Sequence, residues 1–408
     1  MREMIGRPAG KKVLHVTQST GGGVETSVLL LLRHLDARRH ELHLACPPGT
    51  TLASAARALG VRVFEIDMVR NPNPVRDLWA LGGLVRLMRR EGYALVHAHS
   101  AKAGYLGRLA ARLAGSSRTV YSPQAFSYLS QRVAARALFT ALERTAVPLT
   151  DMLVASSQSE LRRAVDEVGF DPRRVVVIPN AIDLAEACAR GPSVAPADPF
   201  VLTAGRMAYQ KNPEMFVRVA RLVIERRPAV RFAFNGGGFA SPLEAAVRRQ
   251  IARAGLEHKI EIVPWTDRQA TLRLIAQCSV FVLTSRFEGL PYVLLEAMML
   301  RKPVVVTDVD GSRDAVDAGR SGYVVRSDDD QAMAERIIAI LDDPALADRM
   351  ASCGREIVSE RYDIKRSIAE IEGLYDRLLD GGDATGGAEL TADRAPVAGG
   401  AGERTPEG

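Results

Sequence analysis

Short runs of apolar, mostly β-branched residues alternate with longer helical patterns along almost the whole chain, and this alternation restricts the possible folds. Strands separated by helices pair in parallel, because each helix carries the chain back along the sheet before the next strand begins. We therefore predict an α/β protein with parallel sheets. The runs interpreted as strands are residues 12–16, 41–45, 61–64, 94–97, 119–121, 152–155, 175–178, 200–203, 230–234, 259–262, 280–283, 303–306 and 322–325.

The pattern stops near the middle of the chain and then restarts. Residues 186–198 contain Gly191, Pro192 and Pro196 and read as a linker. A length of 408 residues also favours two domains. We predict two doubly wound α/β domains in tandem. The expected organisation is a first domain at residues 1–185, a linker at 186–198, a second domain at 199–362, an amphipathic C-terminal helix at 363–380 and a disordered tail at 381–408.

Charge is divided unevenly between the two halves. Residues 1–190 carry 26 Lys and Arg against 16 Asp and Glu, a net charge of +10, whereas the remainder carries 28 against 32. Either this partition is incidental or the first half faces an anionic partner. Nucleic acid is disfavoured, because no basic run exceeds two residues and no aromatic residues are interleaved. An anionic membrane surface is the better candidate.

The four cysteines are far apart and form no CxxC pair. This excludes a disulfide scaffold and a zinc-finger framework, and it fits a reducing compartment. The first residues lack the apolar segment of a signal peptide, and no uncharged apolar run approaches the roughly 20 residues that span a membrane. We therefore expect a cytoplasmic protein.

Residues 285–298 are the most informative stretch. They pass from the apolar run 280–283 through a turn with Gly289 and Pro291 into a helical pattern. The turn places Glu288 at the mouth of the helix, where the helix dipole alone would favour a carboxylate. Glu296 lies about two turns further, near the same face, among residues that should be buried. Two carboxylates on one nearly apolar helix predict a polar ligand with hydroxyl groups.

A loop with two cations opens the second domain. Arg206 and Lys211 flank a turn after the run 200–203, and Pro213 suits the first position of the next helix. A forked guanidinium and an ammonium beside a helix start can bind a diphosphate. Taken alone the two charges could equally be solvated, but the two glutamates favour a binding site.

Two segments of the first domain follow predicted strands. The glycine-rich loop at residues 17–24 is neither a Walker loop nor GxGxxG, so it is either a flexible turn or a phosphate or sugar site. His97 and His99 share one face of a strand end. A metal is disfavoured, because no third ligand lies at metal-binding spacing in the sequence. We interpret His97 as structural and His99 as the candidate for the ligand-binding edge of the sheet.

Asp308 and Asp310 form an Asp-x-Asp pattern of the kind that can hold a divalent metal. Here the pattern follows the run 303–306 and leads into Gly311, so a turn with helix-capping acids is the favoured interpretation. We expect neither a metal nor another cofactor. Cations for phosphates, carboxylates for hydroxyls and glycine loops together predict a nucleotide sugar as ligand.

The chain resembles the retaining glycosyltransferases of family 4, which have the GT-B architecture of two Rossmann-like domains facing a central cleft. The similarity covers about residues 11–380, and Glu288 and Glu296 match the family's two glutamates separated by seven residues. It implies that Glu288 faces the donor sugar and that Glu296 binds the ribose hydroxyls. It also implies a last helix that crosses back onto the first domain. The other donor-binding positions implied are Gly22, Gly23, Arg206, Lys211, Gly289, Leu290 and Pro291.

One position departs from the family pattern. Many relatives carry a histidine in a His-Gly-Phe-like segment after the strand 119–121, and this chain has Gln124 there. Glutamine can hydrogen-bond a sugar but cannot titrate. Either His99 supplies an imidazole to the reaction or none is needed. In the front-face route proposed for the family, the leaving diphosphate takes the acceptor proton, which is compatible with Gln124.

Residues 98–108 resemble family members that build bacterial cell-surface polysaccharides on polyprenyl-phosphate lipids. With the basic first half, this implies a glycan or polyprenyl-linked acceptor and an enzyme either free in the cytoplasm or peripheral at the inner face of the membrane. The segment 129–149, with Arg132, Arg136 and Arg144, is the candidate membrane contact, and an ordinary domain-covering helix is the alternative.

Two other functions remain open at this point. A sugar-nucleotide epimerase of the same architecture would act on the donor alone, and a catalytically silent nucleotide-sugar-binding assembly component would bind without turnover. A nicotinamide-dependent dehydrogenase is the weakest alternative, because no GxGxxG follows a strand with an acid about 20 residues on.

Overall fold

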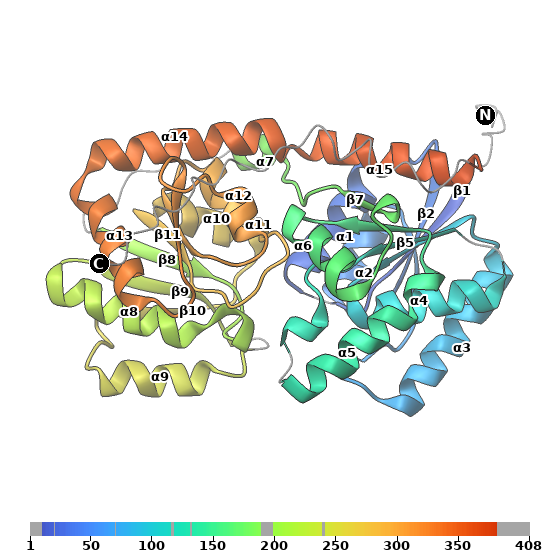
Figure 1. Cartoon of the computed structure of the whole chain (residues 1–408), viewed down its shortest axis with the longest axis horizontal. Helices are drawn as coiled ribbons and strands as arrows, with labels where there is room; N and C mark the ends of the chain where they lie inside the picture. Colours follow the sequence, from blue (N-terminus) through green and yellow to red (C-terminus); the bar gives the residue numbers. More distant parts are fainter. Residues whose placement is uncertain are drawn as a thin grey trace, which may run out of the picture. The chain divides into compact units, whose positions relative to one another are not determined.

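The computed structural model describes residues 10–19, 21–69, 71–115, 118–130, 133–188, 199–238 and 241–381. These residues divide into two compact units, one formed by the chain up to Asn180 together with the final helix and the other by Ala181–Asp363. Each unit is a parallel sheet with helices between its strands, so the prediction of two doubly wound α/β domains is confirmed (Figure 1). The predicted tail, and the predicted linker from residue 189, lie outside the described residues.

The first unit has a seven-stranded parallel sheet in the order β3-β2-β1-β4-β5-β6-β7. The chain starts in the middle, moves outward to β3, and then returns to place β4 beside β1. The carboxyl ends of β1 and β4 therefore flank the point where the strand order reverses, which is where open α/β sheets bind ligands. The elements are β1 (Lys11–Val16), α1 (Gly23–His34), β2 (His40–Cys46), α2 (Thr51–Ala58), β3 (Arg62–Glu65), α3 (Pro74–Glu91), β4 (Leu95–His99), α4 (Ala101–Ala114), β5 (Arg118–Ser122), α5 (Val133–Thr145), β6 (Met152–Ala155), α6 (Gln158–Arg163), β7 (Val175–Val177) and α15 (Ile364–Leu379).

The second unit repeats this plan with six parallel strands in the order β10-β9-β8-β11-β12-β13. Its reversal point lies between β8 and β11, so the loops after these two strands are the expected ligand-binding edge. The elements are α7 (Leu184–Cys188), β8 (Phe200–Ala204), α8 (Pro213–Arg226), β9 (Arg231–Gly237), α9 (Glu244–Arg253), β10 (Ile260–Pro264), α10 (Arg268–Gln277), β11 (Val280–Leu283), α11 (Tyr292–Met299), β12 (Val304–Thr307), α12 (Ser312–Ala315), β13 (Gly322–Val325), α13 (Asp330–Asp342) and α14 (Pro344–Arg361).

Local signals explain where several helices begin and end. The side chain of Asn73 accepts a hydrogen bond from the Arg76 amide at the start of α3, and Pro74 occupies the first helical position. Gly92 ends the helix in the left-handed conformation that glycine adopts without strain. Asp343 and Pro344 start α14 in the same way. Among the helices that the structure describes, none is long and apolar enough to span a membrane.

The final helix, α15, belongs to the first unit and packs against α1 (Figure 1). Ion pairs join this last part of the chain to the first unit: Arg39, just before β2, binds Glu372 and Asp376 of α15, and Lys11 of β1 binds Asp380, just after α15. Tyr375, fully buried, hydrogen-bonds His97 of β4. The chain thus returns to its first unit after completing the second.

Candidate functional site

Two loops at the reversal point of the second unit bring Lys211 and Glu288 together. The loop after β8 carries Lys211, and the loop after β11 carries Glu288. The Lys211 ammonium lies 2.7 Å from Oε1 of Glu288. The glutamate is 5% exposed, and the lysine side chain is 17% exposed. The predicted diphosphate-binding and sugar-binding residues therefore form one ion pair.

Two further donors hold the Glu288 carboxylate. The Ser285 hydroxyl donates to Oε1 at 2.6 Å, and the Gln210 side-chain amide donates to Oε2 at 3.1 Å. Both carboxylate oxygens are bound, so the orientation of the group is set by the protein. Reasoning from the sequence assigned no role to Ser285 or Gln210. Their positions beside Glu288 and Lys211 were the only signal that could have found them.

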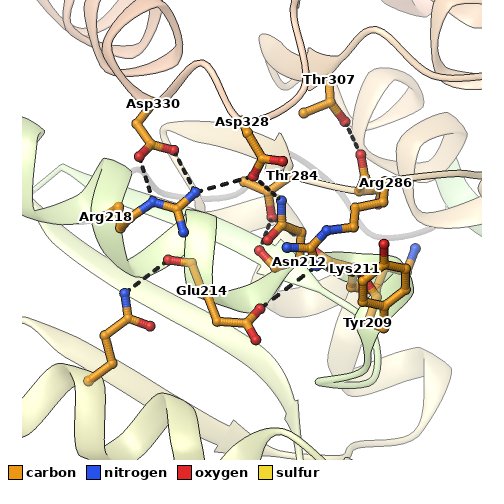
Figure 2. A network of polar contacts seen from close by, with 12 residues as sticks. Tyr209, Lys211, Asn212, Glu214, Arg218, Thr284, Arg286, Thr307, Asp328 and Asp330 are labelled. Carbon is orange, nitrogen blue, oxygen red and sulfur yellow. Dashed lines mark hydrogen bonds and ion pairs between the residues drawn. The ribbon is translucent and has the colours of Figure 1, made fainter. Parts of the chain in front are cut away.

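The backbone carrying Lys211 is anchored from the opposite side (Figure 2). The Thr284 hydroxyl lies 2.9 Å from the carbonyl of Lys211 and 3.1 Å from that of Asn212. Asn212 has a φ of 48°, in the left-handed region that Asn tolerates better than most residues. Its side-chain amide donates to Asp328 at 2.9 Å, and Arg218 binds the same carboxylate oxygen. The network fixes the turn that aims Lys211 at Glu288.

Arg286 links the same two loops through its backbone and its side chain. Its amide donates to the Gln210 carbonyl at 2.7 Å. Its guanidinium donates to the Tyr209 carbonyl at 2.9 Å and lies 4.5 Å from the centre of the Tyr209 ring (Figure 2). The loops after β8 and β11 therefore behave as one assembly.

Glycines from neighbouring segments allow close backbone contacts with these two loops. A Cβ on Gly311 would lie 1.7 Å from the Gly289 carbonyl oxygen, and one on Gly236 would lie 1.9 Å from that of Gly205. Gly311 and Gly236 also have positive φ. Leu290 and Pro291 follow Gly289 directly and lead into α11, while Arg206 follows Gly205, half-buried. The predicted donor-binding positions of this unit thus lie on mutually packed turns.

Glu296 lies in a separate polar pair. It is 3% exposed and accepts from the Arg268 guanidinium at 2.8 Å, and Arg268 also pairs with Glu186 at 3.0 Å. Burial raises the pKa of Glu296, and Arg268 opposes that rise. The expectation of two carboxylates on one helix is wrong: α11 begins at Tyr292, because the turn with Gly289 and Pro291 extends beyond Glu288. Reasoning from the sequence missed Arg268, which lies on a different helix.

The Asp-x-Asp segment is part of a tight turn. Arg313 binds Asp308 at 3.1 Å and approaches Asp310 at 3.9 Å. The acid that caps α12 is Asp314, whose carboxylate accepts from the Gly311 amide at 2.9 Å. Asp308 therefore pairs with Arg313, and Asp314 is a capping acid that the sequence reasoning did not name.

At the reversal point of the first unit, Gly22 precedes α1 with a φ of 76°. A Cβ at Gly22 would meet no described atom within 4 Å. The positive φ of the turn, and not a close contact, therefore explains the glycine at this position. Gly23, exposed, is the first residue of α1. Packing does not require a glycine at position 22, so the predicted donor contact from this loop is compatible with the structure.

His99 lies in a buried cluster of three imidazoles. Its Nε2 is 3.0 Å from Nδ1 of His15 on β1, and the His97 and His99 rings stack at 4.1 Å. His97 lies within hydrogen-bond distance of the hydroxyls of Tyr375 and Ser122. Burial lowers the pKa of His15 to about 3 and holds those of His97 and His99 well below the usual range.

This cluster corrects two expectations. A third histidine does lie near His97 and His99, because the parallel register places His15 opposite His97 on the neighbouring strand. His99 is 0% exposed, which conflicts with an imidazole offered to a ligand. The structural interpretation of His97 agrees with its two hydroxyl partners. His97 uses both ring nitrogens, whereas Nε2 of His15 and Nδ1 of His99 are buried without a hydrogen-bond partner among the described residues.

Gln124 lies in a strained turn after β5. Gln124 and Ala125 have φ values of 53° and 76°, although neither is glycine. The Ala125 amide donates to the buried Glu160 at 2.7 Å, and Ser156 binds the other oxygen of that carboxylate. Backbone strain of this kind persists where surrounding contacts hold it, and it is frequent at functional sites.

Two family models match the chain. The model described as "Glycosyltransferase Family 4" matches residues 21–186, and the one described as "Glycosyl transferases group 1" matches residues 190–357. The chain is 27% identical over 370 residues to the UDP-Gal:alpha-D-GlcNAc-diphosphoundecaprenol alpha-1,3-galactosyltransferase of Escherichia coli, covering 86% of this chain and 93% of that protein. It is 28% identical to the alpha-D-kanosaminyltransferase of Streptomyces kanamyceticus, covering 73% and 81%.

The fold has close counterparts among solved structures. The Anabaena protein Alr3699/HepE, solved in complex with UDP and glucose, superposes with a TM-score of 0.76 at 21% identity, covering 90% of this chain and 99% of that one. At this level of identity the likeness concerns the fold, which is the two-domain GT-B fold.

Proposed function

The chain belongs to the family 4 glycosyltransferases, and on this premise we propose that it moves a sugar from a nucleotide-diphosphate sugar to a lipid-linked glycan with retention of configuration. The observation that carries the proposal is the Glu288 carboxylate held by Lys211, Ser285 and Gln210 where the sheet order reverses. A fixed carboxylate beside a cation suits a ligand that joins a sugar to a diphosphate.

In the proposed division of roles, Lys211 and Arg206 bind the donor diphosphate and Glu288 binds the donor sugar. A cation at the diphosphate stabilises the negative charge that develops there as the glycosidic bond breaks. The leaving diphosphate would accept the proton of the acceptor hydroxyl, so that no titrating base is required. Leu290 and Pro291 would offer backbone near the phosphates.

Glu296 is proposed to bind the ribose hydroxyls. Arg268 keeps it paired within the protein, so one carboxylate oxygen is oriented while the group remains able to accept from hydroxyls. Burial raises its pKa, and Arg268 opposes that effect and favours the ionised acceptor form.

In the first unit, Gly22 and Gly23 are proposed to approach the donor, and Gln124 is proposed to contact sugar or acceptor. The strained turn at Gln124 and Ala125 supports a functional constraint there. His99 is buried and hydrogen-bonds His15, so we assign it a role in positioning the ends of β1 and β4 and not in direct contact with the ligand. Metal independence is also proposed: Arg313 neutralises the Asp308 carboxylate that a divalent cation would need.

The acceptor is proposed to be carried on a polyprenyl lipid at an anionic membrane surface. The Escherichia coli relative is named for an acceptor on diphosphoundecaprenol, and it covers most of this chain. The net charge of +10 over residues 1–190 favours an anionic surface. This would place the enzyme at the inner face of the cell membrane.

A thermal-shift screen against a panel of UDP, GDP and TDP sugars tests the donor class. A donor at about 100 times its dissociation constant should raise the free energy of unfolding by about 2.7 kcal/mol. Lys211→Met should remove that response, and Arg301→Ala, on the α11–β12 turn, should keep it. If no nucleotide sugar stabilised the protein, the proposal would be wrong; binding without transfer to any lipid extract would favour a silent assembly component.

A further inference from the structure

Helix α3 of the first unit exposes a stripe of large apolar side chains. Val75, Leu78 and Trp79 are 67%, 70% and 77% exposed, the highest values among the large hydrophobic residues that the structure describes. Residues three, four, seven and eleven positions apart return to one side of a helix. Val75, Leu78, Trp79, Gly82 and Arg86 therefore form one continuous line, which we call the α3 stripe.

The stripe is divided along its length into an apolar half and a basic half. Its first three members are apolar, and Arg86 is exposed without a partner among the described residues. Arg89 and Arg90 follow at the end of the helix, where Arg89 donates to the Leu113 carbonyl at 2.9 Å and Arg90 pairs with Glu91 at 3.1 Å, so Arg86 is the cation of the stripe. Asp77, the acidic residue in the first turn of α3, forms an ion pair with Lys102 of α4, with 2.6 Å between the carboxylate oxygen and the ammonium. No acidic residue lies on the stripe itself.

The opposite side of α3 accounts for its place in the fold. Ala80, Leu84, Leu87 and Met88 are buried in the core of the first unit, and α3 packs along α4 (Figure 1). Two glycines, Gly82 and Gly83, occur mid-helix, where they cost stability relative to alanine. Packing therefore explains the buried face and leaves the exposed apolar side chains unexplained.

The helix that the sequence suggested as a membrane contact fits less well. The arginines of α5 are engaged within the fold: Arg136 pairs with Glu167 at 3.3 Å, and Arg144 donates to the Glu167 carbonyl at 2.8 Å. Arg132 lies outside the described residues. Helix α5 also exposes two leucines, Leu138 and Leu142. It has no exposed tryptophan beside them, and its described arginines are paired, in contrast to the α3 stripe.

We infer that the α3 stripe inserts into the surface of an anionic lipid bilayer. Val75, Leu78 and Trp79 enter the region between headgroups and acyl chains, and Arg86 binds a headgroup phosphate. Tryptophan favours this interfacial depth, and cations favour anionic headgroups. The inference rests on the proposed lipid-linked acceptor, because an enzyme seated on the bilayer meets such a substrate at its surface.

The chain contains two tryptophans, Trp79 and Trp265, which permits a direct test. The full-length Trp265→Phe variant reports Trp79 alone. With vesicles of phosphatidylglycerol and phosphatidylcholine, its emission should shift to shorter wavelength and be quenched by brominated acyl chains, and with pure phosphatidylcholine both effects should be much weaker. The double variant Val75→Ser/Leu78→Ser should reduce the partition coefficient about tenfold or more, and Arg86→Glu should reduce the preference for phosphatidylglycerol.

The matched control is Leu138→Ser/Leu142→Ser on α5, which should keep vesicle binding within about threefold, since binding follows inserted apolar area. The inference is overturned if Trp79 emission does not respond to vesicles, or if the α5 variant loses binding and the α3 variant does not. A shift that depends on protein concentration without lipid would also overturn it, in favour of a second copy of the chain. Thermal shifts induced by the nucleotide sugar are measured on the same preparations. If the donor still stabilises the protein while vesicles do not bind, the membrane inference fails and the proposed function does not.

Discussion

Lys211 and Glu288 are 77 residues apart in the sequence, and their charged groups meet at 2.7 Å where the loops after β8 and β11 converge. The pair forms because the strand order of the second unit reverses between these two strands. Two cations or two carboxylates could not share this position without repulsion. The pairing therefore stabilises both charged groups at the edge of the sheet in the absence of ligand.

We predict that Lys211→Met destabilises the protein, because it leaves a nearly buried carboxylate without its cation. After allowance for the partial exposure of the lysine, the loss should be about 1–3 kcal/mol in the free energy of unfolding. Urea denaturation of the wild type, each single variant and Lys211→Met/Glu288→Gln measures the coupling. The double variant should be more stable than the sum of the single losses implies; strict additivity would show that the pair is not energetically coupled.

Gly311→Ala should destabilise the second unit by about 3 kcal/mol or more, because a clash adds to left-handed strain. Its Cβ would lie 1.7 Å from the Gly289 carbonyl oxygen. Gly255→Ala is the matched control, since Gly255 has a φ of 65° with no described atom within 4 Å of the added Cβ. The control should lose only about 1–2 kcal/mol. If urea denaturation gave equal losses of unfolding free energy for Gly311→Ala and Gly255→Ala, the contact between Gly311 and the Gly289 carbonyl would not explain the requirement for glycine.

Acid should destabilise the first unit through its buried imidazoles. The pKa of His15 is about 3 in the folded protein, against 6.5 for the ordinary residue, so below pH 6.5 the unfolded chain binds a proton that the folded chain does not. The free energy of unfolding must therefore fall as pH drops from 6.5 toward 3. At one pH unit below 6.5 the loss is about 1.4 kcal/mol for each such histidine, and His97 and His99 add to it.

Urea denaturation at pH 7.5 and 5.5 measures this effect, with His15→Gln as the comparison. The variant should be less stable at pH 7.5 but should lose less on acidification, because one of the three imidazoles of the cluster formed by His15, His97 and His99 is gone. An unchanged pH dependence in the variant would mean that the cluster does not control acid stability.

Transfer should survive removal of divalent metals. Arg313 occupies the Asp308 carboxylate, and Asp314 caps α12. Activity in EDTA and activity of Asp308→Asn should both stay within about threefold of the untreated wild type, because donor charge is stabilised by protein cations. Loss of activity in EDTA, restored by Mg²⁺ or Mn²⁺, would contradict metal independence.

Periodicity and strand-end loops were sufficient to predict the fold and the placement of Arg206, Lys211 and Glu288. The alternation of apolar runs with helices determines parallel sheets, and loops after adjacent parallel strands must share one edge. Lys211 and Glu288 converge because β8 and β11 are neighbours in the sheet, a strand order that the sequence reasoning did not predict. The roles of these residues toward a ligand remain predictions.

Contacts that depend on strand register or on helix ends could not be predicted in this way. His15 joins His99 because β1 pairs with β4 in one particular register, and the two residues are 84 positions apart. Arg268 reaches Glu296 from a different helix. The start of α11 at Tyr292 depends on how the Gly289 turn packs against Gly311, which no local pattern reveals.

The most direct measurement is sugar transfer by the wild type and by Glu288→Gln, with the stabilising nucleotide sugar and a lipid-linked acceptor. The wild type should give a product with the donor's anomeric configuration, established by NMR coupling constants. Glu288→Gln should slow transfer about 10²–10³-fold, because a fixed charge at the reacting sugar is lost, while its urea transition stays cooperative, as expected of a folded variant that has lost one ion pair. Transfer within threefold of the wild-type rate in Glu288→Gln, or a product of inverted configuration, would contradict the account.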